Sequence, residues 1–182
     1  MACQIPPVNF GMVEEGLYRC GMPSPLNFPF LEKLNLRCVI CMLPDDLPEH
    51  FATWLDDQGA KCIHLGEGMQ TRSPWKPVPE DVILEGLNIL LDPSSYPLAV
   101  MCSLGRHQTG TLVGCLRKLQ GWSLAPILEE YRRYAGAKHR QLNEQFIELF
   151  DIDLVVRPPA PPKFFYGWAS PDAGSGGESG PT

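Results

Sequence analysis

Short apolar runs rich in β-forming residues alternate along this chain with stretches of helical periodicity, and this alternation restricts the possible folds. The β-rich runs read LRCVICML, KCIHL and LAVMCS. The helical patterns lie near residues 28–34, 48–58, 79–91, 109–121, 123–135 and 141–150. Alternation of this kind is typical of a sheet covered by helices. The sequence therefore predicts an α/β fold with a central, mostly parallel sheet flanked by helices.

The composition changes after Asp153 to a stretch that reads RPPAPPKFFYGWASPDAGSGGESGPT. A segment rich in Pro, Gly and Ser buries too little apolar surface to offset the entropy of ordering. We expect one domain over residues 1–156 and a mostly disordered tail over 157–182. The PPAPP run is either a solvated spacer, which is the simpler interpretation, or a polyproline ligand for a protein partner. The one sign of a docking segment in the tail is its aromatic group, Phe164, Phe165, Tyr166 and Trp168.

Charge and cysteine content exclude several classes of function. A net charge of -6 and a pI near 5.2 argue against general nucleic-acid binding, so an anionic ligand must be bound by a local site. Seven cysteines, an odd number mostly inside apolar segments, indicate reduced thiols.

The start, MACQIPPVNF, lacks the features of a signal peptide, and no run reaches the roughly 18 apolar residues of a membrane span. We expect no membrane association and a cytoplasmic or nuclear location.

The stretch VMCSLGRHQTG places Cys102 between an apolar strand and an amphipathic helix that opens at Thr109. Ligands of open α/β sheets bind beyond the carboxyl ends of strands, and helix N-termini present unpaired N–H groups. Six residues, including Gly105, separate Cys102 from Thr109, which is enough for successive backbone N–H groups to converge on one anion. The same field favours the thiolate, which is the nucleophilic form of cysteine. The loop therefore predicts a phosphate site with a reactive cysteine.

This stretch resembles the C-x5-R phosphate loop of cysteine-dependent phosphatases, and its surroundings are similar to one branch of them, the plant and fungal atypical dual-specificity phosphatases. The similarity covers roughly residues 6–151 and is carried by PPVNFGMVEEGLYRCGMPSPLNFPFLEKLNLRCVICM, ILEGLNILLD, TGTLVGCLRKLQGW and EEYRRYAGAKHRQLNEQFIELFD. The resemblance implies a dual-specificity phosphatase fold and attack of a thiolate on phosphorus, with a cysteinyl-phosphate intermediate. Phosphotyrosine, phosphoinositides and inositol pyrophosphates are the implied substrates, and no metal or cofactor is implied.

The resemblance also assigns roles to residues by position. Cys102 matches the nucleophile, and Thr109 matches the residue that steadies the thiolate as a leaving group. Lys138 and Arg140 match basic positions at the pocket mouth, although a solvated basic helix end explains them equally well. The residues expected to bind phosphate are Ser103, Leu104, Gly105, Arg106, His107, Gln108, Lys138 and Arg140.

The general acid of these enzymes is usually an aspartate on a separate loop. The sequence VPEDV makes Asp81 the candidate, with Glu80 behind it. A Pro-Glu-Asp sequence is also what the start of a helix prefers, so a capping role for Asp81 is an equal alternative.

Three other groups have a structural interpretation that is simpler than the functional one. Cys38 and Cys41 form a C-x-x-C pair inside an apolar strand, where core thiols are expected rather than zinc ligands. A lone histidine at a strand end, His64, is more often satisfied structurally than catalytic. The loop MQTRSPW is a connection, with Arg72 or Lys76 as the residues through which it would act as a lid.

The loop departs from the family pattern at Met101, Ser103, Leu104 and Gln108, where the family has histidine, two basic residues and arginine. An arginine binds a phosphoryl group with a two-pronged fork, whereas Gln108 offers one neutral amide. Loss of one transition-state donor lowers a rate by about 10²- to 10³-fold, and an arginine in phosphoryl transfer contributes about 10³- to 10⁵-fold. Arg106 stands two positions before Gln108. Its charge attracts phosphate but does not reproduce the fork geometry, so it suits binding better than turnover.

We therefore expect a protein that binds phosphorylated small molecules or phosphoproteins and hydrolyses them poorly or not at all. One alternative is an active cysteine-dependent phosphatase on inositol pyrophosphates or phosphotyrosine, with Arg106, Lys138 and Arg140 supplying the missing charge. The other is a non-catalytic scaffold that binds a protein partner through its sheet, helices and tail.

Overall fold

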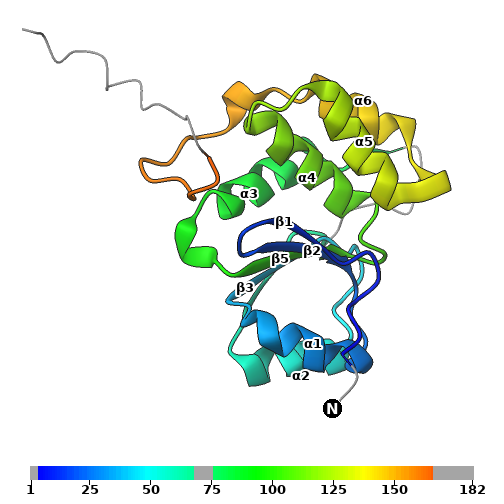
Figure 1. Ribbon diagram of the computed structural model, residues 1–182, viewed down its shortest axis with the longest axis vertical. Helices are drawn as coiled ribbons and strands as arrows, with labels where there is room; N and C mark the ends of the chain where they lie inside the picture. The colour runs from blue at the N-terminus through cyan, green and yellow to red at the C-terminus, as the bar shows by residue number, and fades with distance from the viewer. Residues whose placement is uncertain (1–3, 68–75, 166–182) are drawn as a thin grey trace, which may run out of the picture.

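The computed structural model describes residues 4–67 and 76–165, and in this part of the chain a five-stranded sheet lies between two layers of helices (Figure 1). The sheet has the order β1-β2-β5-β3-β4. Neighbouring strands run parallel except β1, which is antiparallel to β2. The strands are β1 (Gly11–Glu14), β2 (Leu17–Gly21), β3 (Cys38–Cys41), β4 (Lys61–His64) and β5 (Leu98–Cys102). The predicted α/β fold with a mostly parallel sheet is confirmed.

The helices divide between the two faces of the sheet (Figure 1). One face is covered by α1 (Phe28–Leu31) and α2 (Glu49–Gln58). The other face is covered by α3 (Glu80–Leu90), α4 (Gln108–Leu119), α5 (Leu124–Ala135) and α6 (Gln141–Leu149). The helical patterns of the sequence predicted all of these regions. The region near 28–34 differs in detail, because a 3₁₀ turn (Glu32–Leu34) follows α1 and ends at Asn35 in the left-handed conformation.

The hairpin of β1 and β2 was not among the predicted strands. Both strands are short, and each carries a charged residue, Glu14 and Arg19, so neither is the continuous apolar run that marks β3 and β5. Gly16, with φ +74°, lies in the turn between them, where a side chain would be disfavoured. The hairpin places β2 beside β5, where Gly21 pairs with Cys102. The end of β2 is therefore adjacent to the loop that follows Cys102.

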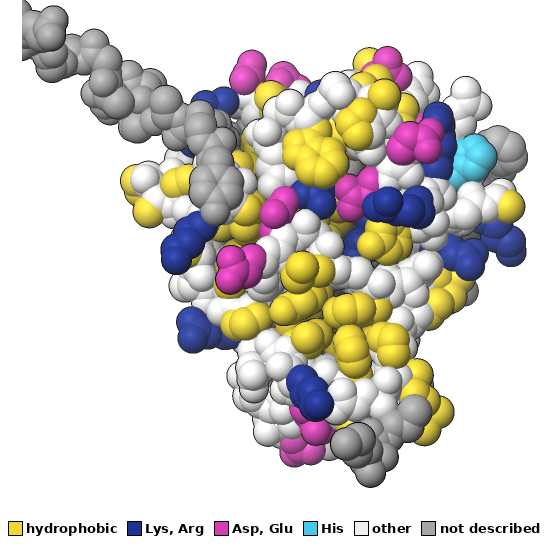
Figure 2. All heavy atoms as spheres, in the orientation of Figure 1, with side chains coloured by type: hydrophobic (Ala, Val, Ile, Leu, Met, Phe, Trp, Pro, Cys, Tyr) yellow, Lys and Arg dark blue, Asp and Glu magenta, His cyan; other side chains and the backbone are white. Residues whose placement is uncertain are grey.

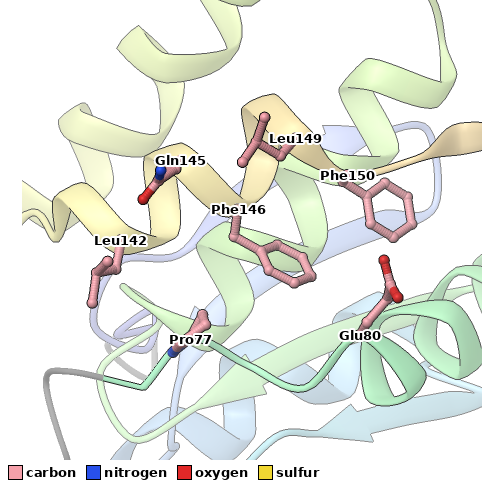
Figure 3. Close-up of a pocket in the computed structure, with 7 residues that line it drawn as sticks. All are labelled: Pro77, Glu80, Leu142, Gln145, Phe146, Leu149 and Phe150. Atoms are coloured by element: carbon pink, nitrogen blue, oxygen red, sulfur yellow. The ribbon is translucent and has the colours of Figure 1, made fainter.

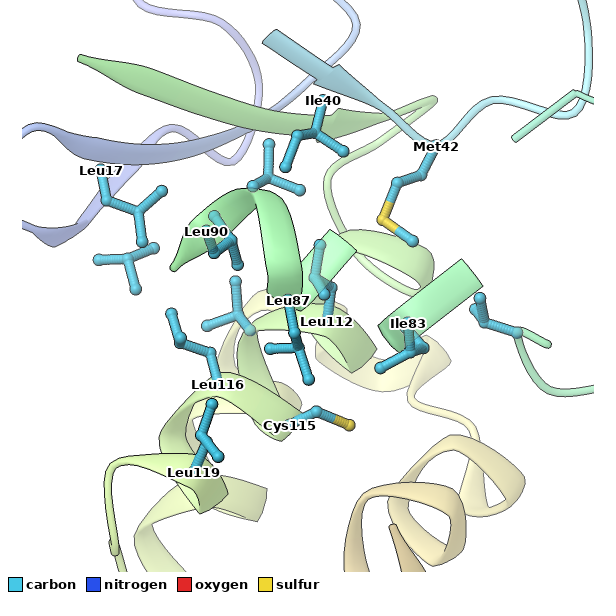
Figure 4. Packing of buried hydrophobic residues seen from close by; sticks show 14 of the residues in the cluster. Leu17, Ile40, Met42, Ile83, Leu87, Leu90, Leu112, Cys115, Leu116 and Leu119 are labelled. Carbon is cyan, nitrogen blue, oxygen red and sulfur yellow. The ribbon is translucent and has the colours of Figure 1, made fainter. Parts of the chain in front are cut away.

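Two hydrophobic cores lie on opposite faces of the sheet. The larger core, between the sheet and α3 to α6, contains leucines such as Leu87, Leu112 and Leu116 (Figure 4). The smaller core includes Phe51 and Trp54 of α2. Side chains of β5 alternate between the cores, with Leu98, Val100 and Cys102 in the larger and Ala99 and Met101 in the smaller. Cys102 therefore faces the layer that contains α4 and α5.

Packing continues past the expected domain boundary at residue 156. Phe165 is 8% exposed and belongs to the larger core, and the ring of Phe164 lies 5.8 Å from the ring of Tyr96. Tyr166, Trp168 and the rest of the 166–182 segment lie outside the described residues, so the domain division and the disorder of the tail stay predictions. No helix in the described part of the chain is long and apolar enough to cross a membrane.

On the face drawn in Figure 2, basic and acidic side chains are interspersed over the helical layer, above a band of hydrophobic side chains. This face shows no broad basic field, which agrees with the net charge of -6. Attraction of an anion must come from a local cluster of cations.

Candidate functional site

The loop of residues 103–107 joins the last residue of β5, Cys102, to the first residue of α4, Gln108. Gly105 has φ +65°, and a Cβ built on it would lie 2.5 Å from the carbonyl carbon of Cys20. A Cβ on Gly21 would lie 2.9 Å from the carbonyl carbon of Leu104. Such distances are shorter than any ordinary van der Waals contact, so the absence of side chains allows the loop to fold tightly against the end of β2.

A pocket of about 340 Å³ opens over this loop. Its walls come from the loop, from the segment after β3, and from the turn between α5 and α6. The pocket therefore lies beyond the carboxyl ends of β3 and β5, which is where ligands of open α/β sheets bind. The lining residues are Pro44, Asp45, Cys102, Ser103, Leu104, Arg106, His107, Gln108, Lys138 and Arg140.

The structure brings together nearly all of the residues that were expected to bind phosphate. Gly105 is the exception, because it is buried against β2 behind the loop. Thr109 also lies inside the protein, at the start of α4, and its Oγ1 has no hydrogen-bond partner within residues 4–67 and 76–165. The hydroxyl of Thr109 is therefore available to donate to a neighbouring anion.

Asp81 is not among the residues that line the pocket. It is exposed in the first turn of α3, where a carboxylate interacts favourably with the helix N-terminus. Glu80 lines a different hollow of about 360 Å³, where it faces Phe146 and Phe150 of the α6 region (Figure 3). No lysine or arginine is among the residues that line this second hollow, so it is poorly suited to an anion.

The carboxylate among the residues that line the pocket belongs to Asp45, in the segment after β3. Asp45 is not among the residues that the sequence predicts for the site, because PDDLPEH resembles an ordinary loop before a helix. The available signal was its position in the segment that follows a buried strand, four residues after Cys41. Since β3 pairs with β5, the segments that follow the two strands meet at one edge of the sheet.

The pocket concentrates positive charge. Arg106 extends from the loop, and Lys138 and Arg140 approach from the turn between α5 and α6. Burial, with the nearby charges of Arg140 and Arg106, lowers the pKa of His107 to about 4. The imidazole of His107 is therefore neutral at physiological pH.

Tyr131 of α5 connects the parts of this pocket. Its hydroxyl lies 3.4 Å from Nδ1 of His107 and accepts hydrogen bonds from the backbone N–H of Arg140, at 3.2 Å, and from Nδ2 of Asn143, at 3.1 Å. Burial raises the pKa of this phenol, so it stays protonated. One buried side chain thus fixes the backbone of Arg140 relative to the loop.

A further cation, Arg19, lies behind the loop. Arg19 of β2 is fully buried, and its Nη2 donates to the carbonyl oxygen of Gly105 at 3.2 Å. Its guanidinium carbon lies 3.6 Å from the centroid of the Tyr134 ring, and its Nη1 lies 3.9 Å from Oε1 of Glu130. Burial lowers the pKa of Arg19 to about 10, which leaves it charged at neutral pH. Arg19 is not among the residues that the sequence predicts for the site.

The remaining candidates have structural explanations or lie outside the described residues. Nε2 of His64 lies 2.8 Å from the carbonyl oxygen of Leu43, so its ring already has a partner. Cys38 and Cys41 are buried in β3, and burial raises the pKa of both thiols. No group of three potential metal ligands occurs within residues 4–67 and 76–165. The predicted lid loop, including Arg72, lies outside the described residues, and Lys76 is exposed.

Comparison with known proteins gives one consistent result. Residues 4–168 match the sequence model of the tyrosine phosphatase family. The chain is 57% identical over 162 residues to the probable tyrosine-protein phosphatase DG1060 of Dictyostelium discoideum, a match that covers 88% of this chain and 96% of that protein. It is 46% identical over 147 residues to the inositol diphosphatase DSP3 of Arabidopsis thaliana, covering 81% of this chain and 72% of that protein.

Among solved structures, the chain matches the core catalytic domain of the PP-IP phosphatase SIW14 from S. cerevisiae, determined in complex with citrate. The TM-score is 0.78 at 38% sequence identity, and the match covers 83% of this chain and 90% of the other. Residues 4–168, which match the family model, include the sheet, both helical layers and the loop after β5.

Proposed function

Because this chain belongs to the tyrosine phosphatase family, we propose that it binds phosphorylated small molecules or phosphoproteins over the Cys102 loop and hydrolyses them slowly. The observation that carries the proposal is the position of Gln108. This residue begins α4 and lines the pocket together with Cys102, at the point where the resemblance assigns the arginine of the phosphate loop.

The pocket supports a two-step hydrolysis by the family's chemistry. The thiolate of Cys102 attacks phosphorus, the S–P bond forms and the bond from phosphorus to the leaving oxygen breaks. Asp45, as general acid, gives its proton to that oxygen. Water then attacks the cysteinyl phosphate and gives a proton to the Asp45 carboxylate, while the S–P bond breaks and inorganic phosphate leaves. The hydroxyl of Thr109 donates a hydrogen bond to the departing thiolate.

Slow turnover follows from the kind of charge that the pocket supplies. Arg106, Lys138 and Arg140 attract a phosphate, but none of them occupies the position of Gln108 at the start of α4. An attraction that is equal for the bound substrate and the transition state tightens binding without raising kcat. The arginine fork acts on the charge that spreads over the equatorial oxygens, and a glutamine amide supplies one neutral donor there.

A second candidate is an active phosphatase, and the composition of the pocket favours it. Asp45 lies in the pocket with three cationic side chains, which suits a substrate with several phosphates. A relative named as an inositol diphosphatase shares 46% identity with this chain. In this case the substrate class is inositol pyrophosphates or phosphotyrosine, and the three cations together replace the missing arginine.

Phosphate release from an inositol pyrophosphate and from a phosphotyrosine peptide distinguishes these candidates. Wild type is compared with Cys102→Ser, Gln108→Arg and Gln108→Lys. We expect weak release by wild type and a gain in kcat of about 10²- to 10³-fold for Gln108→Arg, the value of one restored donor. Gln108→Lys adds the charge without the fork, so it should improve binding more than kcat.

Two outcomes contradict the proposal. If wild type turns over rapidly, Cys102→Ser is inactive and Gln108→Arg brings no gain, the chain is an active phosphatase. If neither wild type nor Gln108→Arg releases phosphate, and inorganic phosphate does not slow alkylation of Cys102, the protein is a scaffold.

The assignment of the general acid is tested in the Gln108→Arg background, where turnover is measurable. Asp45→Asn should lower kcat by about 10²- to 10⁴-fold for a substrate with a poor leaving group. Asp81→Asn is the matched control and should leave kcat unchanged, because Asp81 is exposed in α3 and does not line the pocket. The reverse result would assign the acid to Asp81.

A further inference from the structure

Arg19 lies directly behind the loop that follows Cys102. On β2 it stands two residues before Gly21, which pairs with Cys102, so the side chains of Arg19 and Cys102 are on the same face of the sheet. Its guanidinium contacts α5 through Tyr134 and approaches α4 closely, since a Cβ on Gly110 would lie 3.5 Å from Nη2. The charged group is therefore enclosed between the sheet, α4 and α5.

The positive charge of Arg19 is incompletely paired within the described residues. Its Nε and Nη1 have no hydrogen-bond partner there. The nearest carboxylate, Glu130, is 3.9 Å from Nη1, whereas its Oε2 accepts a hydrogen bond from Nε of Arg117 at 2.9 Å. A buried guanidinium ordinarily needs partners for most of its five N–H donors. A positive charge with so few partners can stabilise a negative charge that forms close to it.

The hydrogen bond to Gly105 orients the loop as well. In a trans peptide the C=O and the next N–H point in opposite directions. Because the carbonyl of Gly105 points back to Arg19, the N–H of Arg106 points away from it. The contact thus fixes the orientation of a backbone donor of the loop.

From these contacts we propose that Arg19 is a positioning residue for the site: it orients the loop through Gly105 and stabilises negative charge on Cys102 from behind. This role rests on the proposed function. Arg19 supplies a buried positive charge behind the loop, whereas Gln108, which lines the pocket, is neutral. Arg19 acts on the nucleophile, not on the phosphoryl oxygens, so it supports attack by the thiolate and does not replace the arginine fork.

The test is the rate at which iodoacetamide alkylates Cys102 between pH 5 and 9, followed by mass spectrometry of the peptide that contains it. Iodoacetamide is neutral, so the rate follows the fraction of thiolate. Arg19→Gln should raise the pH at which alkylation is half-maximal by about one pH unit or more, because the variant loses one opposite charge near the thiolate. Alkylation at pH values below the half-maximal point should then be about tenfold slower. Arg19→Lys should retain most of the wild-type rate.

Glu130→Gln provides a test of opposite sign in which Arg19 itself is kept. Removing the carboxylate beside the guanidinium should strengthen the field at Cys102 and speed alkylation. Glu14→Gln is the matched control, because Glu14 also pairs with Arg117 but is not paired with Arg19. It should leave the rate unchanged.

A purely structural role for Arg19 predicts another pattern, in which Arg19→Gln and Glu130→Gln both loosen the loop and change alkylation in the same direction. That result overturns the proposal, as does a folded Arg19→Gln variant with the wild-type profile. If Arg19→Gln does not fold, Glu130→Gln decides, and an unchanged or slower rate contradicts the proposal. Failure of the proposed function is seen separately, as absence of protection of wild-type Cys102 by inorganic phosphate.

Discussion

Replacing Gly105 by alanine tests how tightly the loop is folded against β2. With φ +65°, an alanine at this position adopts the left-handed conformation, which costs about 1–2 kcal/mol. Its Cβ would also lie 2.5 Å from the carbonyl carbon of Cys20 and 2.7 Å from the backbone nitrogen of Gly21. These are backbone atoms of a paired strand, so no side-chain rotation relieves the overlap, and overpacking adds about 1–3 kcal/mol.

We therefore expect Gly105→Ala to lower the free energy of unfolding by about 2–5 kcal/mol, measured by urea denaturation. The matched control is Gly59→Ala at the end of α2. Gly59 also has φ +65°, but nothing lies within 4 Å of a Cβ built there. Only the conformational cost of about 1–2 kcal/mol should appear in the control.

The two variants should also differ at the site. Because Gly105→Ala displaces the loop from β2, inorganic phosphate should no longer protect Cys102 from alkylation in this variant. Gly59 lies at the C-terminal end of α2 and not in the loop, so phosphate should still protect Cys102 from alkylation in Gly59→Ala. Equal losses of stability in the two variants, with protection retained in both, would refute the tight packing of the loop against β2.

Three further predictions concern the surroundings of the site. Arg117→Met leaves Glu14 and Glu130 without their shared cation and should lower the free energy of unfolding by about 3 kcal/mol in urea, with a loss below 1 kcal/mol arguing against a structural ion pair. The pKa of His107 is about 4 in the folded protein and near 6.5 when unfolded, so the unfolded chain binds more protons between these values. Stability should therefore fall as the pH drops from 6.5 to 4, and His107→Gln should flatten that part of the profile; an unaltered profile would contradict the assignment. Tyr131→Phe removes an acceptor shared by two N–H donors and should destabilise the protein by about 1–3 kcal/mol, and a neutral effect in thermal unfolding would show that water replaces the phenol.

The parts of the fold that the sequence predicted are those with a local, continuous pattern. Strands β3 and β5 are buried along their whole length, so they appear as uninterrupted apolar runs. Strand β2 does not meet this criterion, because the charged Arg19 interrupts its apolar run. A fully buried arginine is compatible with a strand only through its partners on the loop and on α5, and those partners are distant in sequence.

The same distinction separates the site residues that could be predicted from those that could not. The loop from Cys102 to Thr109 is one contiguous segment, and a resemblance to a known motif identifies it directly. Asp45 joins the site only because β3 lies beside β5 in the sheet, and Arg19 joins it only because β2 lies on the other side. For Asp81 the sequence left a catalytic and a capping role open. Its side chain is exposed in the first turn of α3 and does not line the pocket, and its role stays a prediction.

The strand order has a consequence for how this protein opens under native conditions. Strand β5 has a hydrogen-bonded neighbour on each side, whereas β1 and β4 are the outer strands of the described sheet. Local opening that begins at either edge releases the outer strands while β5 stays paired. Amide hydrogens of β5 should therefore exchange with solvent only on global unfolding, and those of β1 and β4 much earlier. We therefore expect the strand that ends in Cys102 to be the most persistent part of the sheet and to hold Cys102 in place when the outer strands open.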